Sequence, residues 1–137
     1  MKKLHLGYPG EDEEVELLDR VVGHHPIEDL EAVTTLADLS AARKTAAGVT
    51  VASQVREYAT RLAGYTREHA AIGVSPRGSI ALLRAAQGRA VLDGRDYVVP
   101  DDVQAEAEVV LAHRIRADAD HTGRDLVADA LERVPVE

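Results

Sequence analysis

Apolar residues recur at helical spacing along most of the chain, and turn-forming residues divide them into short segments. The first stripe, formed by Val15, Leu18 and Val22, follows an acidic run at residues 11–14. Negative charge is favourable at the start of a helix, where unpaired backbone N–H groups are exposed. The pattern therefore predicts a first helix that begins in the acidic run and ends before Pro26.

Two later helix starts carry the pattern of a capping box, in which a Thr and an acidic residue three positions on bond each other's backbone N–H groups. These are Thr35 with Asp38 and Thr122 with Asp125. We expect the helix after Thr35 to end at Gly48, and the helix after Thr122 to be the last of the chain.

The middle of the chain predicts three more helices. One runs to about His69, and the next begins at Ser75 and Pro76, because Ser is a good N-cap and Pro suits the first helical turn. From residue 80 to residue 91 this helix is apolar almost all round, which is typical of a central, largely buried helix. A further helix begins at Pro100.

Only residues 49–51 and 97–99 are read as extended segments, and we expect them to pair. We find no internal repeat and no low-complexity linker. The sequence therefore predicts an all-α fold: one compact domain of about five to six helices with a minimal two-stranded pairing.

Composition and charge remove several functional classes. A chain of 137 residues without cysteine forms one domain and has no disulfide, thiolate metal site or cysteine nucleophile. No apolar run reaches the roughly 18 residues of a membrane span, and the first residues lack a signal-peptide pattern, so we expect a soluble, cytoplasmic protein. The net charge of −8 argues against nucleic-acid binding.

Arg77 is the side chain whose position most requires an explanation. It lies in the first turn of the helix that begins at Pro76, where a cation is mildly unfavourable. The position is explained if an anion docks there, because the N–H groups of a helix start and a guanidinium together bind phosphate. The alternative is a solvated surface arginine, which is common.

Five runs of sequence together resemble one protein family. The longest is GVSPRGSIALLRAA at residues 73–86, followed by LDGRDYVVPDDV at residues 92–103. Shorter matches are YTREH at residues 65–69, LAHR at residues 111–114 and LGYP at residues 6–9. These runs resemble the C-terminal helical lid of MoxR-type AAA+ ATPases, and the similarity covers nearly the whole chain.

The resemblance implies a division of the chain and a set of nucleotide contacts. Residues 1–10 correspond to the end of a core strand and the hinge, and residues 11–137 to the lid. Arg77 matches the sensor-2 arginine, the residue implied to act in catalysis. The implied nucleotide-binding set is Gly7, Tyr8, Pro9, Ser75, Arg77 and Gly78.

The resemblance also implies cofactors and partners of a longer protein. No G-x-x-x-x-G-K-[ST] phosphate loop occurs in the chain, so ATP and Mg²⁺ would be held by an AAA+ core outside it, and this chain alone should be inactive. The implied partners are that core, neighbouring subunits of a homo-oligomeric ring, which the family likeness indicates is a hexamer, and von Willebrand factor A-domain proteins. The implied role is chaperone-like remodelling or maturation of other proteins.

Two other functions stay open at this stage. One is a stand-alone helical adaptor that binds a protein and no nucleotide. The other is the lid of a related chelatase-like or MCM-like ATPase. A phosphate loop encoded upstream of Leu4 would favour an ATPase over the adaptor.

Three smaller expectations concern the histidines, two helix caps and Arg84. We expect no metal site among the histidines, because metal sites need ligands that converge on one point. The adjacent His24 and His25 diverge on any regular element. The remaining candidates form only a loose cluster: His113, Asp118, Asp120 and His121. Ala52 and Val99 occupy positions where similar proteins have a Ser or Thr cap, which should weaken two helix starts. Arg84, two turns beyond Arg77, is expected not to face the phosphate.

Overall fold

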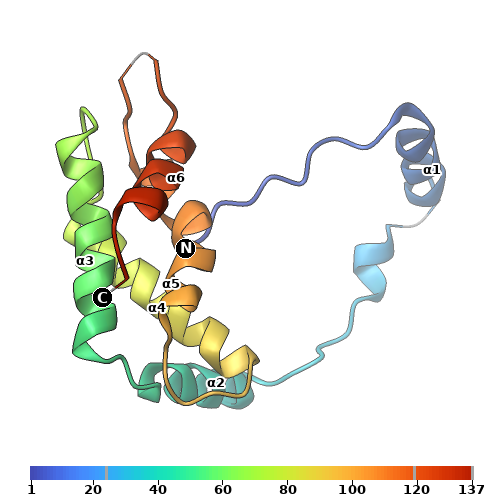
Figure 1. Ribbon diagram of the computed structural model, residues 1–137. Helices are drawn as coiled ribbons and strands as arrows, with labels where there is room; N and C mark the ends of the chain where they lie inside the picture. Colours follow the sequence, from blue (N-terminus) through green and yellow to red (C-terminus); the bar gives the residue numbers. More distant parts are fainter. Residues whose placement is uncertain (24, 119, 137) are drawn as a thin grey trace. The chain divides into compact units, whose positions relative to one another are not determined.

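The computed structural model describes residues 1–23, 25–118 and 120–136. Within them it contains six α-helices and two short 3-10 helices, which confirms the predicted all-α fold (Figure 1). The α-helices are α1 (Glu11–Val21), α2 (Leu36–Gly48), α3 (Ser53–Glu68), α4 (Pro76–Leu92), α5 (Pro100–Leu111) and α6 (Gly123–Arg133). The 3-10 helices, which were not predicted, are η1 (Pro26–Asp29) and η2 (Ala112–Arg114).

The chain forms two units, each with its own internal contacts. One consists of Leu4–Ala41 and the other of Met1–Lys3 with Ala42–Glu137. We call the first the N-terminal segment and the second the helical unit. This division is not the boundary predicted after residue 10. The predicted boundary separates the lid from a core outside this chain, and it stays a prediction.

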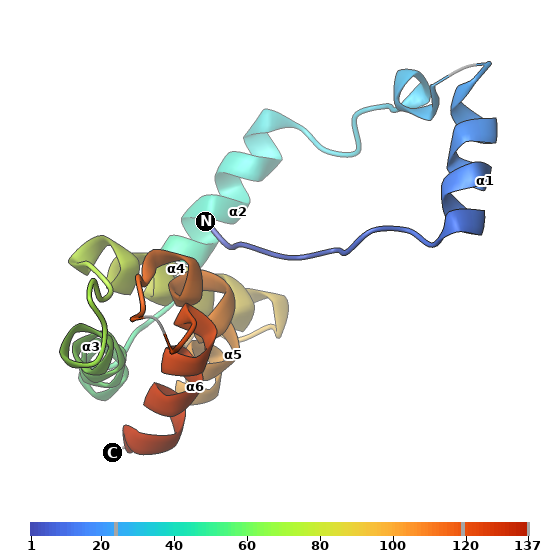
Figure 2. The ribbon, with the colours of Figure 1, turned by 90° about the horizontal axis from the view of Figure 1, so that it is seen from above.

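The core of the helical unit is built from α3, α4, α5 and α6, which pack against one another (Figures 1 and 2). Small and branched aliphatic side chains fill it, as expected from a chain without Phe or Trp. The fully buried side chains include Tyr58, Leu62, Leu82, Ala86, Val103, Ala107, Val110 and Val127.

Helix α4 packs directly on α3 and α5, as predicted for a central helix, but burial is confined to one face. Leu82, Ala86 and Ala90 are fully buried, whereas Ile80 is 51% and Leu92 89% exposed. The helix is therefore central, as predicted, but less buried than the pattern indicated. An apolar pattern cannot distinguish a covered face from one left open, because that depends on where the neighbouring helices lie.

Two minimal strand pairings join loops of the helical unit. The predicted pairing is confirmed as a parallel bridge between Thr50 and Tyr97, in which the Thr50 N–H donates to the Asp96 carbonyl at 2.8 Å. A second, antiparallel bridge joins Ile72 to Arg116 through two hydrogen bonds of 3.1 and 2.9 Å, and it was not predicted. It links the loop before α4 to the loop before α6.

Both predicted capping boxes are present. The Asp38 N–H donates to Thr35 Oγ1 at 3.1 Å and the Asp125 N–H to Thr122 Oγ1 at 3.3 Å, while each carboxylate accepts from the Thr N–H in return. Hydrogen bonds from these threonines lower the pKa of both Asp38 and Asp125.

The start of α5 is stabilised by a side chain that the sequence analysis did not single out, Asp102. Val99 is the N-cap residue and its side chain makes no capping bond, as its apolar type predicts. Asp102, three residues on, instead accepts the Val99 N–H at 2.9 Å, and the Arg95 guanidinium donates to both Asp102 oxygens at 2.8 and 2.7 Å. The expected weakness of this helix start is therefore offset by Asp102. Ala52, at the N-cap of α3, also makes no side-chain capping bond.

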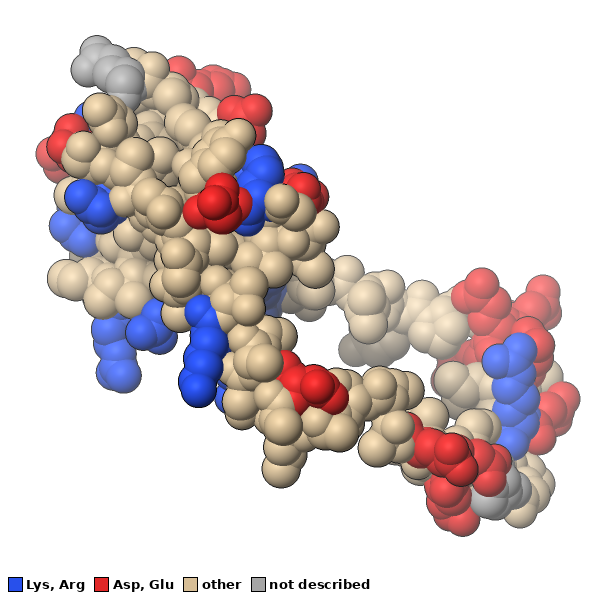
Figure 3. Space-filling view, turned by 90° about the horizontal axis from the view of Figure 1, so that it is seen from below, with Lys and Arg blue, Asp and Glu red and all other residues tan. Residues whose placement is uncertain are grey.

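The N-terminal segment leaves its apolar side chains uncovered. None of the residues described in α1, η1 or α2 is buried, and the predicted stripe of α1 is exposed, with Val15 at 54%, Leu18 at 56% and Val22 at 86%. The segment holds ten of the 24 acidic residues of the chain and one of its 16 basic residues, Arg20. Figure 3 shows these acidic side chains gathered on it.

Residues 1–10 form no helix or strand within this chain. Across the described residues, no helix is both long and apolar enough to cross a membrane.

Candidate functional site

The start of α4 holds three of the predicted site residues. Ser75 is the N-cap residue, Pro76 begins the helix and Arg77 follows it. The Ser75 carbonyl accepts the Gly78 N–H at 2.8 Å, and the Ser75 hydroxyl makes no capping bond, contrary to expectation. The Gly78 N–H is thus already bonded within the protein.

Tight packing fixes where this helix begins. Val74 is completely buried, and a Cβ added at Gly78 would lie 2.5 Å from Val74 Cγ1. A Cβ added at Gly73 would lie only 2.4 Å from the Arg67 Cα. Gly73 therefore allows the loop before α4 to approach the last turn of α3, and Gly78 allows the first turn of α4 to pack on Val74. The predicted role of Gly78 in nucleotide binding gains no support from this geometry, which gives it a packing role.

We expect Gly73→Ala to destabilise the helical unit by about 1–3 kcal/mol, because the new methyl group meets backbone atoms that cannot rotate away. Gly64→Ala, within α3, is the matched control. A Cβ there meets nothing within 4 Å, so this change should stabilise the helix by about 0.5–1 kcal/mol. Urea unfolding of both variants measures the difference, and equal stabilities would contradict the packing argument.

Arg77 is exposed and lines an open hollow of about 520 Å³. In the described part of the chain its side chain has no hydrogen bond or ion pair. The hollow is lined by Met1, Lys2, Arg77, Ile80, Ala81, Arg84 and Ala85. Three of these are cations and none is acidic, so the surface favours an anion.

Arg84 was expected to face elsewhere, and the structure shows it lining the same hollow. Seven residues make nearly two full turns of an α-helix, which returns Arg84 to the face of Arg77. This spacing was a usable sequence signal. Lys2 differs from both arginines because its ammonium group lies 2.6 Å from Glu106 Oε2, so its charge is already paired.

Gly7, Tyr8 and Pro9 belong to the N-terminal segment rather than to the helical unit. Gly7 adopts a φ of 75°, in the left-handed region that favours glycine, and Tyr8 is completely exposed. The predicted nucleotide-binding residues therefore fall into two groups. The structure brings Ser75, Arg77 and Gly78 together and leaves the second group as a prediction.

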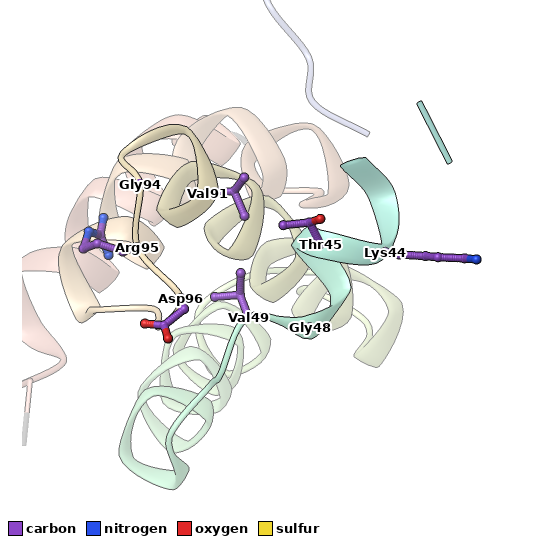
Figure 4. A pocket seen from close by; sticks show the side chains of 8 residues that line it. All are labelled: Lys44, Thr45, Gly48, Val49, Val91, Gly94, Arg95 and Asp96. Atoms are coloured by element: carbon purple, nitrogen blue, oxygen red, sulfur yellow. The ribbon is translucent and has the colours of Figure 1, made fainter. Parts of the chain in front are cut away.

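A second hollow, of about 590 Å³, lies between the end of α2 and the loop between α4 and α5 (Figure 4). Its lining includes two cations, Lys44 and Arg95. Arg95 is paired with Asp102, and the Lys44 side chain extends away from Val49 and Val91 in Figure 4. This hollow therefore offers an anion less than the one beside Arg77.

The histidines form no metal cluster among the residues that the structure describes, and His24 lies outside those residues. Burial, with the nearby Arg114 charge, lowers the pKa of His113.

Comparisons with known proteins agree with this architecture. A family model described as the AAA lid domain matches residues 62–133, more than half of the chain and the part that contains α4 and Arg77. The chain belongs to the AAA lid domain family. Its fold matches, with a TM-score of 0.83 and 26% identity, the crystal structure of a protein from Cytophaga hutchinsonii described as a candidate ATPase, over 100% of this chain and 46% of that one.

Curated relatives identify the type of lid as MoxR. The chain is 33% identical over 124 residues to "Chaperone MoxR1" of Mycobacterium tuberculosis, covering 82% of this chain and 32% of the relative. It is 39% identical over 133 residues to "Uncharacterized protein YeaC" of Bacillus subtilis, covering 96% of this chain and 42% of that protein. This lid thus spans less than half the length of the relatives it matches.

Proposed function

We propose that the lid senses nucleotide phosphate through Arg77 in a MoxR-type AAA+ ATPase. The observation that carries the proposal is an exposed arginine in the first turn of α4 that has no partner among the described residues and lies on a hollow whose charged side chains are all cations. We use the term parent ATPase for a chain in which this lid follows a nucleotide-binding core.

The chemistry of the helix start supports a phosphate ligand. Backbone N–H groups at a helix N-terminus carry partial positive charge, and a guanidinium adds a planar fork of donors that fits phosphate oxygens. In the described chain the Arg77 N–H and the Ser75 hydroxyl have no hydrogen-bond partner, so both are free to donate. Among these donors, only the Arg77 guanidinium carries a full positive charge.

In the parent ATPase the core would bind ATP and Mg²⁺ and carry out phosphoryl transfer. The lid would close over the nucleotide, place Arg77 near the transferred phosphate and pass its movement to neighbouring subunits of a ring, for which we propose a hexamer. The relative named "Chaperone MoxR1" supports chaperone-like remodelling or maturation of client proteins as the output. Von Willebrand factor A-domain proteins are the proposed partners, and the cytoplasm is the proposed compartment.

We expect the isolated 137-residue chain not to hydrolyse ATP and to bind it more weakly than about 1 mM. One arginine and a helix start contribute about 1.5–3 kcal/mol, which is too little without a phosphate loop. Calorimetric titration with Mg·ATP and a phosphate-release assay test the isolated chain. Turnover above that of a mock purification would contradict this division of roles, as would a parent chain that shows no Mg²⁺-dependent hydrolysis.

A protein-binding adaptor is the second candidate, favoured by the exposed apolar stripe of α1 in the acidic N-terminal segment. An adaptor would need no nucleotide, so ATP turnover by the parent ATPase, together with its loss on changing Arg77, would exclude it. The lid of a chelatase-like or MCM-like ATPase would show the same turnover. The named MoxR relatives favour the MoxR type.

A further inference from the structure

The backbone that leads into α4 is held by two consecutive side chains of α3. Thr66 Oγ1 accepts the Val74 N–H at 3.0 Å and donates to the Ala63 carbonyl at 2.8 Å. Arg67 Nε donates to the Val74 carbonyl at 2.6 Å. Both polar backbone groups of Val74 are therefore bound by the last turn of α3.

These contacts lie in a fully buried and tightly packed part of the helical unit. Thr66 and Val74 are both 0% exposed, so a hydrogen bond lost between them would not be replaced by water without opening the core. Gly73 allows the two backbones to approach closely, since any Cβ there would meet Thr66 and Arg67 backbone atoms below 3 Å. The side-chain bonds and the close approach thus act on two consecutive residues, Val74 and Gly73.

Arg77 lies only three residues beyond Val74, in the first turn that this attachment begins. A helix start that is fixed to α3 sets both the direction of α4 and the position of its first exposed side chains. A preorganised charge stabilises a transition state because it does not have to move into place during the reaction.

We propose that Thr66 and Arg67 are positioning residues, which hold Val74 and thereby keep Arg77 in the orientation that its phosphate contact requires. This proposal rests on the proposed function. A rotation of α3 would be transmitted to Arg77 through Val74, so the attachment also makes α3 the element through which lid movement reaches the site.

The test uses the parent ATPase with Thr66→Val, which keeps the shape of the side chain and removes the hydroxyl, and Thr66→Ser, which keeps the hydroxyl. We expect Thr66→Val to lower kcat at least about threefold while the KM for ATP changes less than about twofold, because the effect acts on transition-state positioning. Thr66→Ser should restore turnover. Arg67→Met removes the exposed side of the attachment, without touching the core, and should lower kcat in the same way.

The decisive measurement repeats these changes in an Arg77→Ala background. If Thr66 acts through Arg77, Thr66→Val should have no further effect on kcat there, whereas a general loss of stability would lower kcat by the same factor in both backgrounds and would overturn the proposal. Should Thr66→Val fold poorly, Arg67→Met provides the same comparison.

Two outcomes separate this proposal from the one on which it rests. If Arg77→Ala lowers turnover while Thr66→Val and Arg67→Met match the wild type, the positioning role is wrong and the sensor role stands. If Arg77→Ala leaves turnover unchanged, the sensor role fails.

Amide hydrogen exchange at Val74 in the isolated lid gives an independent readout: the exchange should quicken in Thr66→Val and remain slow in Thr66→Ser. Unchanged exchange in Thr66→Val would overturn the attachment itself.

Discussion

Arg77→Ala is expected to lower the ATP turnover of the parent ATPase by at least about tenfold, with a much smaller effect on ATP affinity. A guanidinium that meets charge developing on the transferred phosphate acts mainly in the transition state, and single arginines of this kind contribute about 10³–10⁵ in rate. A sensor that also positions a lid is expected to contribute less. Nucleotide affinity depends chiefly on the phosphate loop of the core, which the change leaves intact. Steady-state kcat and the ATP dissociation constant measure the two effects separately.

Two further variants test whether the effect depends on the guanidinium and on the position of Arg77. Arg77→Lys should restore little activity, because an ammonium cannot reproduce the planar fork of donors. Arg133→Ala is the matched control: Arg133 is another exposed arginine without a partner in the described structure, in the last turn of α6 rather than on the hollow. Arg84 is unsuitable as the control, because it lines the hollow with Arg77. Wild-type turnover in Arg77→Ala would refute the sensor assignment, and equal losses in Arg133→Ala would make the effect non-specific.

Asp102→Ala is expected to produce the largest loss of stability, about 2–3 kcal/mol, or a fall in Tm of about 10–20 °C for a unit of this size. The Asp102 side chain is 2% exposed, accepts two hydrogen bonds from Arg95 and accepts the Val99 N–H at the start of α5. Its loss leaves Arg95 paired only with the exposed Asp93 and leaves the helix start without its side-chain acceptor. The effect falls below that of a fully buried pair because Arg95 remains 23% exposed to water.

The neighbouring Asp101 provides the control, since it is exposed in the same helical turn, and Asp101→Ala should change stability by less than about 0.5–1 kcal/mol. Asp102→Asn should fall between the two, because the amide oxygen still accepts the Val99 N–H while the charge is lost. Thermal unfolding followed by circular dichroism compares the three. If Asp101→Ala is as destabilising as Asp102→Ala, the Arg95–Asp102 pair has no special role.

Acid should weaken the same contact. Hydrogen bonds from Arg95 lower the pKa of Asp102, so the folded protein binds fewer protons than the unfolded chain at acidic pH. The stabilisation is therefore complete above the ordinary aspartate pKa of about 3.9 and is lost as the pH falls below it. We expect the difference in stability between the wild type and Asp102→Asn to narrow over that range.

Local patterns in the sequence were sufficient for the helices and for two of their starts. The Thr35–Asp38 and Thr122–Asp125 capping boxes form as predicted because each depends on residues only three positions apart. The same reasoning failed at Ser75, whose hydroxyl makes no capping bond although the Arg77 N–H has no backbone acceptor in the described residues. A residue type that favours capping therefore does not by itself ensure that the capping bond forms.

The sequence by itself determined the helical class, the family resemblance and the choice of Arg77, because these depend on periodicity and on residues close together in the chain. Only the tertiary structure decided which face of α4 is covered, that Arg84 shares the hollow of Arg77, and that Thr66 and Arg67 hold Val74. The bridge between Ile72 and Arg116 and the support of α5 by Arg95 and Asp102 belong to the same class. Such contacts depend on how helices and loops pack in space, and packing follows from the sum of many weak interactions rather than from any one residue pattern.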